Sequence, residues 1–548
     1  MHGSWLQPHP QTLTAMLRSQ AEMAPERVAI TMAGEDFTYG QLLRKSNSIA
    51  RGLIDLGINR GDVLAIFAEN TITHLQAEFA AARVGAIEVM INTAFKGSFL
   101  AHQLQDSGAK LVIVSPALLQ TLLEIMPLIS TVTSIVVLGA CQDIDPAAAD
   151  VPILGLAALA DHASTDLSQL RDPLSTDPCS IVYTSGTTGP SKGVLLTQNY
   201  LCLFAELHSS LWWRGPEDVF YSVGPLYHLG AKGVACLGSI YRGVRCVQDE
   251  RFSASNFWAR IRAERCTATM MLGSVAMLLW GREPAADEGI ATVYINPVPV
   301  KLLGAMQARW SCRFESAYGL SEAAPVIHTG PGMPLRPGSS GKVDHLHFDV
   351  RIFDDDDKEL AAGDVGEIVI RPKRPHSIFE GYYRNPAATL AQLRSCWFHT
   401  GDLGRFDAEG YFYFVDRKKD YLRRRGENIS SFEVEAAITS HPSVIEAAVV
   451  AVSCELGEDE IKVVVMVREG YTLSNEALTA YCIEKMPYFA VPRYIEFVDD
   501  LPRTPSGKVE KHKLRAQGVG NAWDREQAGI VLSGKRRTRS NDAESSQS

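Results

Sequence analysis

The sequence predicts an α/β protein with a large N-terminal domain and a small α+β C-terminal domain. Three observations lead to this prediction. Strand-like and helix-like segments alternate over the first 140 residues, short strands joined by turns fill residues 340–416, and the pattern changes again after residue 417. Alternation of strands and helices favours a parallel or mixed sheet with helices on both faces. A chain of 548 residues is long enough for two or more domains.

The N-terminal alternation can be followed along the chain. Helices are expected after Thr38, which is a suitable N-cap residue, and over residues 73–86. Strands are expected over residues 28–31, 62–68, 110–115 and 134–139. The alternation resumes over residues 181–280, whereas the turn-rich segment 340–416 indicates a β-rich subdomain.

The C-terminal part begins with a basic turn over residues 417–428 and a helix that starts near residue 430. After this helix we expect two strands rich in β-branched residues, at 444–452 and 461–467. A further helix and a last strand at 493–498 are expected to follow. We therefore predict domains over residues 1–417 and 418–515. The polar composition of residues 516–548 predicts a disordered tail.

Composition and charge exclude several classes of protein. The net charge is −10 and the pI is about 5.8, so the chain is a poor candidate for binding nucleic acid, which needs cationic neutralisation of phosphates. The ten cysteines form no CxxC pair or Cys/His cluster, which indicates reduced thiols in the cytoplasm. The N-terminus lacks a signal-peptide core, and no apolar run reaches the ~18 residues that a transmembrane helix needs.

The segment IVYTSGTTGPSKGV, residues 181–194, is the main candidate for a phosphate site. Glycine lets backbone N–H groups approach an anion closely, hydroxyls donate hydrogen bonds and lysine adds a positive charge. The candidate residues are Thr184, Ser185, Gly186, Thr187, Thr188, Gly189 and Lys192. The segment departs from the Walker A pattern at Ser191 and Gly193. A flexible surface turn is the alternative, although the density of donors after a strand argues against it.

Four motifs in order resemble those of the adenylate-forming (AMP-binding) superfamily, which includes the acyl-CoA synthetases. They are YTSGTTGPSKGV (183–194), YGLSE (318–322), the segment 398–430 with its TGD and DR elements, and LPRTPSGKVEKHKL (501–514). The resemblance spans roughly residues 10 to 515. Within the superfamily, the YFVDR and RRGENIS elements and FEGYYRNPAAT (379–389) are similar to crotonobetaine/carnitine–CoA ligases.

The resemblance implies an ATP-dependent acid–CoA ligase that uses Mg²⁺ and CoA and releases AMP and pyrophosphate. The 184–192 loop would hold the phosphates, with Thr184 close to the reaction. Glu322 would bind Mg²⁺, a role that suits a hard oxygen ligand, and Ser321 stands beside it. Tyr318, with Ala317 and Gly319, would contact adenine. Asp402 would bind the ribose, and Arg417 would reach the ribose or a phosphate. Taken singly, Tyr318, Asp402 and Arg417 could equally be a packed aromatic, a turn residue and a surface ion-pair partner.

The resemblance also implies two positions of a small, mobile C-terminal domain. In the first, Lys508 would stabilise the adenylation transition state. In the second, rotation about Lys419 would bring Gly426 to the pantetheine arm, with the run Arg423, Arg424 and Arg425 near the CoA phosphates. A solvated basic turn is the alternative for this run, and which arginine would contact CoA stays open. His228 matches a gate between the acyl pocket and the thiol tunnel, or is a packed core histidine.

The acid substrate stays open at this stage. INPVPVKLL (295–303) stands where the family carries a glycine-rich stretch that shapes the acyl pocket. Carnitine-like betaines, medium-chain acids and polycyclic acids are all compatible with the sequence. Two rival functions are an adenylating enzyme that loads a carrier protein and a catalytically silent binding protein. A monomer and a homodimer are equally compatible.

Overall fold

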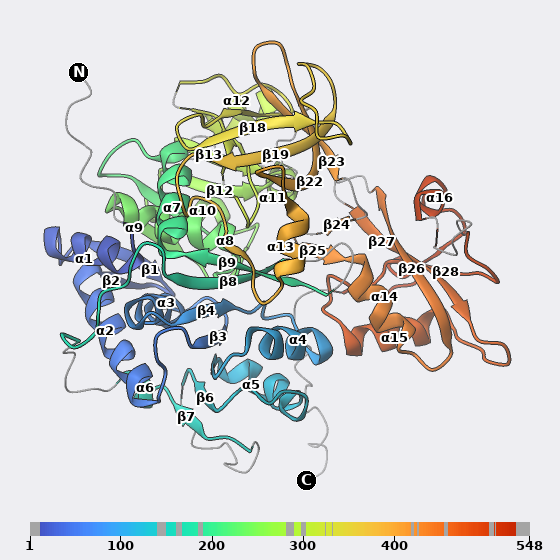
Figure 1. Ribbon diagram of the computed structural model, residues 1–548, viewed down its shortest axis with the longest axis horizontal. Helices are drawn as coiled ribbons and strands as arrows, with labels where there is room; N and C mark the ends of the chain where they lie inside the picture. The colour runs from blue at the N-terminus through green and yellow to red at the C-terminus, as the bar shows by residue number, and fades with distance from the viewer. Residues whose placement is uncertain are drawn as a thin grey trace, which may run out of the picture. The chain divides into compact units, whose positions relative to one another are not determined.

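The computed structural model divides into two compact units, Met1–Tyr421 with Glu455–Glu458 and Leu422–Cys454 with Asp459–Ser548 (Figure 1). Each unit is described below by itself. The structure describes residues 11–139, 150–160, 167–184, 190–280, 290–296, 303–323, 325–330, 332–417, 421–424, 427–453, 459–502, 509 and 511–532.

An eight-stranded sheet forms the first layer of the N-terminal unit. Its central strands are buried along their whole length and run parallel, as expected for a sheet covered by helices on both faces. In spatial order the strands are β20 (Gly381–Tyr382), β9 (Lys192–Thr197), β8 (Pro178–Thr184), β4 (Ile87–Met90), β3 (Val63–Phe67), β5 (Leu111–Val114), β6 (Ser134–Val137) and β7 (Ile153–Gly155). Helix α2 (Tyr39–Asp55) precedes β3, and the helices that follow strands of this sheet include α3 (Ile72–Val84), α4 (Gly97–Ser107), α5 (Pro116–Leu123), η1 (Met126–Leu128) and α6 (Ala157–Ala160).

A seven-stranded sheet forms a second layer. In spatial order its strands are β14 (Arg313–Glu315), β13 (Thr292–Asn296), β12 (Ala268–Leu272), β10 (Val219–Ser222), β11 (Arg245–Gln248), β1 (Val28–Met32) and β2 (Glu35–Thr38). Helix α7 (Gln198–Trp212) contacts both β9 and β13 and is buried on most of its surface, so it is part of the core between these layers. The other helices of this region are α1 (Leu13–Met23), α8 (Leu229–Ala231), the π-helix η3 (Lys232–Leu237), α9 (Gly238–Arg242), α10 (Phe257–Ala263), α11 (Gly273–Trp280) and α12 (Leu303–Trp310).

An antiparallel sheet makes up the predicted β-rich subdomain and extends it back to residue 317. Its strands are β15 (Ala317–Tyr318), β16 (Ile327–His328), β17 (Ser339–Val343), β23 (Phe412–Arg417), β22 (Trp397–Phe406), β19 (Gly366–Pro372) and β18 (Phe348–Phe353), with β21 (Leu393–Arg394) paired to β22. Helix α13 (Pro386–Gln392) precedes β21. The predicted α/β fold class is confirmed, and Thr38 caps α2 in a capping box with Gln41.

The C-terminal unit is an α+β structure, as predicted. Its main sheet has the order β26 (Val444–Ser453), β27 (Asp459–Val467), β28 (Tyr494–Phe497) and β29 (Trp523–Asp524), and β24 (Tyr421–Arg424) pairs with β25 (Glu427–Ser430) in a small second sheet. The helices are α14 (Ser431–Thr439), α15 (Asn475–Lys485) and α16 (Lys511–Ala516). The predicted domain boundary between residues 417 and 418 stays a prediction.

Two predictions for this region are wrong. Within the expected basic turn over residues 417–428, Tyr421–Arg424 form β24 and β25 begins at Glu427. The expected disorder from residue 516 does not hold for residues 516–532, because β29 pairs with β28 and Arg525 is fully buried. Composition indicated disorder since the tail is polar, but Asp524, Arg525 and Glu526 form ion pairs within the unit. Residues 533–548 lie outside the described residues.

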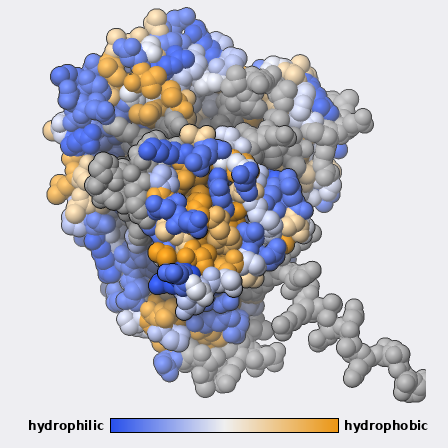
Figure 2. Space-filling model, turned by 90° about the vertical axis from the view of Figure 1, so that its right-hand side faces the viewer, coloured by the Kyte–Doolittle hydropathy of each residue, from blue (hydrophilic) through white to orange (hydrophobic). Residues whose placement is uncertain are grey.

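In the part of the chain that the structure describes, no helix is long and apolar enough to cross a membrane. Figure 2 shows that apolar residues on the face turned toward the viewer are bordered by hydrophilic ones. All eight cysteines among the described residues are free, and seven of them are buried.

Candidate functional site

The β8–β9 hairpin carries the two ends of the predicted phosphate loop. Thr184 is the last residue of β8 and Lys192 is the first residue of β9, and the antiparallel register places them opposite each other. Both side chains are half-buried. Ser185, Gly186, Thr187, Thr188 and Gly189 lie outside the described residues. The hairpin therefore places one hydroxyl and one ammonium group at the base of this loop.

Lys192 and Glu322 both contact Tyr382, the lysine over its ring and the glutamate at its hydroxyl. The Lys192 Nζ lies 5.0 Å from the centroid of the Tyr382 ring, and the Tyr382 hydroxyl donates a 2.9 Å hydrogen bond to Glu322 Oε1. Strand β20 positions Tyr382 because it adds to β9, with Tyr382 opposite Val194. The Phe379 N–H donates to the Glu322 carbonyl at 2.8 Å. A cation and a carboxylate thus lie near each other at the edge of the first sheet.

Tyr382 is not among the site residues that the sequence predicts. It lies within FEGYYRNPAAT, a segment that had indicated only the similarity to one branch of the superfamily. The signal was present in the sequence, but the contact with Glu322 depends on the pairing of β20 with β9.

Tyr318 and Asp402 form a second buried pair. The Tyr318 hydroxyl donates a 2.8 Å hydrogen bond to Asp402 Oδ2. The Tyr318 ring packs against Phe412 and lies stacked on Phe414 with centroids 6.2 Å apart. The β22–β23 register places the backbone of Arg417 opposite Asp402, and its side chain lies outside the described part of the structure.

The backbone conformation and local hydrogen bonds explain the residues of the TGD element, Thr400, Gly401 and Asp402. Gly401 has a φ of 73°, a conformation that favours glycine, and its N–H donates to Glu367 Oε1 at 3.1 Å. The Thr400 hydroxyl accepts a 3.1 Å hydrogen bond from the Asp402 N–H. The pairing of β22 with β19 is irregular here, because the step from Glu367 to Val369 on β19 spans Leu403 to His399 on β22. The Asp402 side chain in this stretch accepts the hydrogen bond from Tyr318.

The segment that links these two pairs is supported by α7. The Tyr200 hydroxyl donates a 2.8 Å hydrogen bond to the Ser321 carbonyl. Ala317 is buried in β15 and Gly319 is exposed directly after it. Ala317, Tyr318, Gly319, Ser321 and Glu322 therefore lie on one short segment that a hydrogen bond ties to α7.

His228 is the N-cap residue of α8, and its half-buried ring lies 4.8 Å from the ring of Tyr227. One turn later, Lys232 is completely buried and pairs with two buried carboxylates. Its Nζ lies 2.8 Å from Glu78 Oε1 and 2.7 Å from Glu88 Oε2. His74 Nε2 lies 3.4 Å from the other Glu88 oxygen. This cluster is not among the sites that the sequence predicts, although Glu78 and Lys232 each stand as a charged residue within a mainly apolar segment.

Burial and ion pairing shift the pKa values of the two carboxyl groups in this cluster in opposite directions. Burial raises the pKa of Glu78 to about 7. Burial also acts to raise the pKa of Glu88, but the Lys232 charge and a hydrogen bond from His74 outweigh it, so this pKa falls below its ordinary value. Burial lowers the pKa of His74, which favours the neutral ring. The cluster ties η3, and the turn with His228 before it, to α3 and β4.

The basic run near residue 424 is not a uniformly solvated turn. The Arg424 side chain is buried, and its Nη1 donates to the carbonyls of Phe489 and Val491 at 3.0 Å each. These contacts are internal to the C-terminal unit, so Arg424 is not presented to a ligand at the surface. The side chain of Arg423 and residues Arg425 and Gly426 lie outside the described residues, as do Lys419 and Lys508.

A magnesium site built only from protein ligands does not occur in the described ranges, which contain no group of three or more His, Cys, Asp or Glu side chains suited to a metal ion. A single carboxylate such as Glu322 still fits Mg²⁺ that is bound mainly through phosphate oxygens and water, because Mg²⁺ commonly uses one or two carboxylates together with substrate phosphates.

Two family models match the chain. A model described as AMP-binding enzyme matches residues 17–383, and a model described as AMP-binding enzyme C-terminal domain matches residues 433–508. One curated relative, a crotonobetaine/carnitine–CoA ligase of Citrobacter koseri, is 32% identical over 92% of this chain and 99% of its own length.

Two solved structures share the fold over most of the chain. A double mutant of an o-succinylbenzoate CoA synthetase from Bacillus subtilis, bound to a product analogue, has a TM-score of 0.79 with 23% identity and covers 92% of this chain and 98% of its own. An amide bond synthetase from Marinactinospora thermotolerans has a TM-score of 0.78 with 26% identity and covers 91% and 99%.

Proposed function

The chain belongs to the AMP-binding enzyme family, within its acyl-CoA ligases, and from this membership we propose that it joins a carboxylic acid to CoA at the expense of ATP. The predicted resemblance to the adenylate-forming superfamily is confirmed by the family models and by the curated relative. Enzymes of this family use ATP, Mg²⁺ and CoA. The substrate carboxylate oxygen attacks the α-phosphorus and pyrophosphate leaves. The CoA thiolate then attacks the acyl carbon and AMP leaves.

The contact between Tyr382, Lys192 and Glu322 carries the proposal. Two anions must meet in the first half-reaction, so the enzyme has to neutralise and orient charge. Lys192 and Thr184, with the loop of residues 185–189, would hold the β- and γ-phosphates. Glu322 would bind the Mg²⁺ that accompanies these phosphates. The Tyr382 hydroxyl donates to the Glu322 carboxylate, and Lys192 lies over the ring of the same tyrosine.

The pair of Tyr318 and Asp402 supports a nucleoside site. In the proposal Ala317, Tyr318 and Gly319 contact adenine, Ser321 lies beside the metal ligand and Asp402 accepts hydrogen bonds from the ribose. Arg417 would reach the ribose or a phosphate, since its backbone lies opposite Asp402. Lys508 would stabilise the α-phosphate during adenylation.

The thioester step would use other residues. Lys419 would be the hinge, Gly426 would allow the pantetheine arm to approach the backbone, and Arg425 would attract CoA phosphates. His228 would separate the acyl pocket from the thiol tunnel, a position supported by its half-buried ring at the start of α8.

The substrate we place first is a small betaine such as carnitine or crotonobetaine, because a curated relative at 32% identity is named for these acids. Medium-chain and polycyclic acids are the other candidates. We also propose a cytoplasmic location, which the free thiols of the described cysteines support, and a monomer or homodimer as the assembly.

Product identification tests the function. The purified protein is given MgATP, CoA and a panel of betaines, medium-chain acids and polycyclic acids, and AMP, pyrophosphate and acyl-CoA are detected by mass spectrometry. We expect a thioester with one class of acid. Pyrophosphate and an acyl-adenylate without thioester would point instead to a carrier protein as acceptor. Failure of every acid to support ATP–pyrophosphate exchange would overturn the proposal in favour of a silent binding protein.

A further inference from the structure

The C-terminal family model ends at residue 508, and the described residues 511–532 beyond it belong to the C-terminal unit. Strand β29 pairs antiparallel with β28, with Tyr494 opposite Asp524 and Ile495 opposite Trp523. The turn after β29 folds back on itself, since the Ile530 N–H donates to the Arg525 carbonyl at 3.0 Å. The segment 523–530 is therefore an added edge of the sheet.

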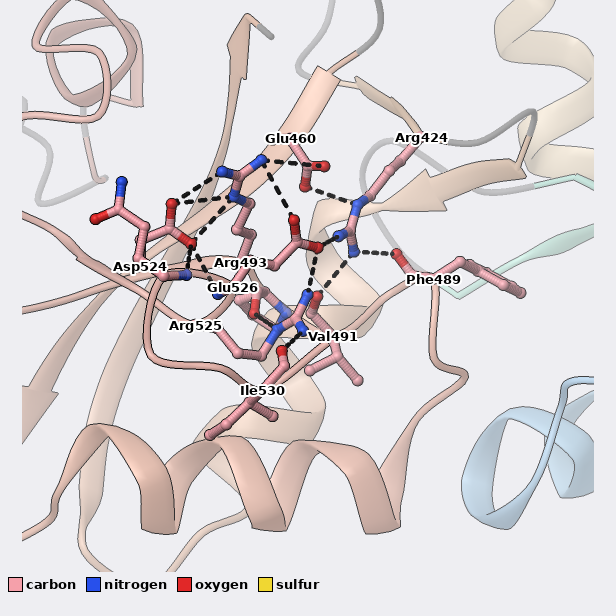
Figure 3. Close-up of polar contacts among 11 residues, drawn as sticks. Arg424, Glu460, Phe489, Val491, Arg493, Asp524, Arg525, Glu526 and Ile530 are labelled. Atoms are coloured by element: carbon pink, nitrogen blue, oxygen red, sulfur yellow. Dashed lines mark hydrogen bonds and ion pairs between the residues drawn. The ribbon is translucent and has the colours of Figure 1, made fainter. Parts of the chain in front are cut away.

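Three arginines and three carboxylates hold this edge in place (Figure 3). They are Arg424, Arg493, Arg525, Glu460, Asp524 and Glu526. Arg493 binds Asp524 with Nη2 to Oδ2 at 2.9 Å, and its Nη1 lies 3.6 Å from Glu526 Oε2. Arg525 is fully buried and donates from Nε to the Pro492 carbonyl at 3.2 Å. The number of positive charges equals the number of negative charges.

The charge state of Asp524 follows from these contacts. Burial acts to raise the pKa of Asp524, but hydrogen bonds from the Arg493 guanidinium and from the backbone N–H groups of Glu526 and Gln527 lower it below the ordinary value. Asp524 is therefore a firmly ionised partner for Arg493.

Arg424 joins this cluster from a distant part of the chain. Its Nε lies 2.7 Å from Glu460 Oε2, its Nη1 donates to the Phe489 and Val491 carbonyls, and its Nη2 lies 3.9 Å from Glu526 Oε1. Only 1% of Arg424 is exposed. Removing one member of such a cluster leaves a buried charge without compensation, which is costly. The end of β24 is thus tied to the segment between α15 and β28 and to the turn after β29.

We propose that Arg424 and the segment 523–530 form a clamp that positions β24, and that the thioester-forming half-reaction depends on this clamp. The proposal rests on the proposed function. Residues 425 and 426, which that function assigns to CoA, follow Arg424 directly in the chain. Displacement of Arg424 therefore displaces them, whereas the nucleotide-binding residues from Thr184 to Asp402 belong to the other compact unit. Arg424 is a positioning residue and Glu526 acts through it.

The test uses the full-length protein and two carboxylate variants, Glu526→Gln and Asp524→Asn, with Glu484→Gln as the matched control. The Glu484 side chain is 70% exposed on α15 of the same unit and forms an ion pair with its neighbour Lys485. Hydrogen exchange of the peptide that covers residues 421–430 reports on β24. ATP–pyrophosphate exchange and thioester formation from a supplied acyl-adenylate report on the two half-reactions.

We expect both cluster variants to raise hydrogen exchange at 421–430 and to slow the thioester step about tenfold, with an increased KM for CoA, while adenylation changes by less than about twofold. Glu484→Gln should change none of these. Unaltered exchange at 421–430 in both variants, or an equal fall of the two half-reactions, would overturn the proposal. If Arg424→Ala and Glu526→Ala each slow the thioester step and their effects do not add in the double variant, the clamp is supported. If only Arg424→Ala slows this step, Arg424 contacts CoA directly and the clamp is overturned.

The clamp and the proposed function fail in different ways. If the wild-type protein adenylates an acid but forms no thioester, the function as a CoA ligase is wrong, and the dependence of the thioester step on the clamp falls with it. Hydrogen exchange at 421–430 then still decides whether the segment 523–530 holds β24.

Discussion

The Tyr382 hydroxyl donates a 2.9 Å hydrogen bond to Glu322 Oε1, so the residue proposed to bind Mg²⁺ is oriented by a tyrosine from an edge strand of the first sheet. Lys192 lies over the same ring. A hydrogen bond to a carboxylate restricts which oxygen can face a metal, and partners of this kind tune metal ligands.

Tyr382→Phe should keep the ring beneath Lys192 and remove only the hydrogen bond to Glu322. We expect acid-dependent ATP–pyrophosphate exchange to fall about tenfold at low Mg²⁺ and to recover partly at high Mg²⁺, because the carboxylate is less well oriented. Tyr383→Phe is the matched control, since its ring contacts Arg384 on the neighbouring position. The same Mg²⁺ dependence for both variants would contradict the role given to Tyr382.

Asp402→Asn should raise the KM for ATP by about tenfold and leave the KM for CoA unchanged, because an amide is a weaker acceptor for ribose hydroxyls than a carboxylate. Tyr318→Phe removes the other hydrogen-bond partner of the same carboxylate. The two substitutions affect one contact, so their effects on the KM for ATP should not add in the double variant. Steady-state kinetics measures all three variants, and additive effects would show that Tyr318 and Asp402 act separately.

Lys232→Met should destabilise the protein by about 3–5 kcal/mol at neutral pH, because it leaves Glu78 and Glu88 buried without their cation. The deficit should shrink as the pH falls from 8 to 5. In the unsubstituted protein the pKa of Glu78 is already raised to about 7. Glu78 therefore contributes to the free energy of unfolding below its unfolded-state pKa, and the protein loses this contribution as the pH rises through 7.

Without the ammonium group of Lys232, the pKa of both carboxyls should rise further, and both would bind protons at pH 5. His74 faces the same site and can also gain a proton there once Lys232 is gone, since the Lys232 charge is one of the causes that lower its pKa. Urea unfolding at several pH values measures the effect. If the loss in free energy of unfolding caused by Lys232→Met grows toward pH 5, this account is wrong. Lys45→Met, at an exposed position of α2, serves as the control.

Lys508→Ala should abolish acyl-adenylate formation, by several orders of magnitude in rate, and leave thioester formation from a supplied adenylate largely intact. The reason is that Lys508 is proposed to act only on the α-phosphate. Replacing Gly426 with a bulky residue should have the opposite effect on the two half-reactions. Rapid-quench measurements separate the steps, and an equal loss of both steps in Lys508→Ala would rule out the assigned division of roles.

Local patterns predicted most elements of the fold. The apolar runs that became β3, β5 and β6 alternate with helices, and burial on both faces explains why they contain almost no polar residues. Thr38 marks the start of α2 because its hydroxyl and the Gln41 side chain satisfy the first free N–H groups. Such signals act over a few residues, so they can be recognised in the sequence alone.

The candidate site was predicted in part for a similar reason. The glycine- and hydroxyl-rich segment after β8, and the short elements around Tyr318 and Asp402, each carry their chemistry within a few positions. Their contacts with one another depend on sheet pairing. Tyr382 reaches Glu322 because β20 adds to β9, and the Tyr318–Asp402 hydrogen bond joins β15 to β22, two strands that are distant in the sequence.

The sequence by itself thus determined the fold class, the order of the motifs and the reaction class that they indicate. Only the tertiary structure decided which charges are buried and which partners they have. Lys232 is paired with carboxylates from α3 and β4, and Arg424 is held by Glu460 and by carbonyls before β28. The predicted disordered tail instead contains Asp524, Arg525 and Glu526 within an ordered edge. The physical reason is that a charge can be buried only when opposite charges from distant segments lie within a few ångströms, and this proximity exists only in the assembled fold.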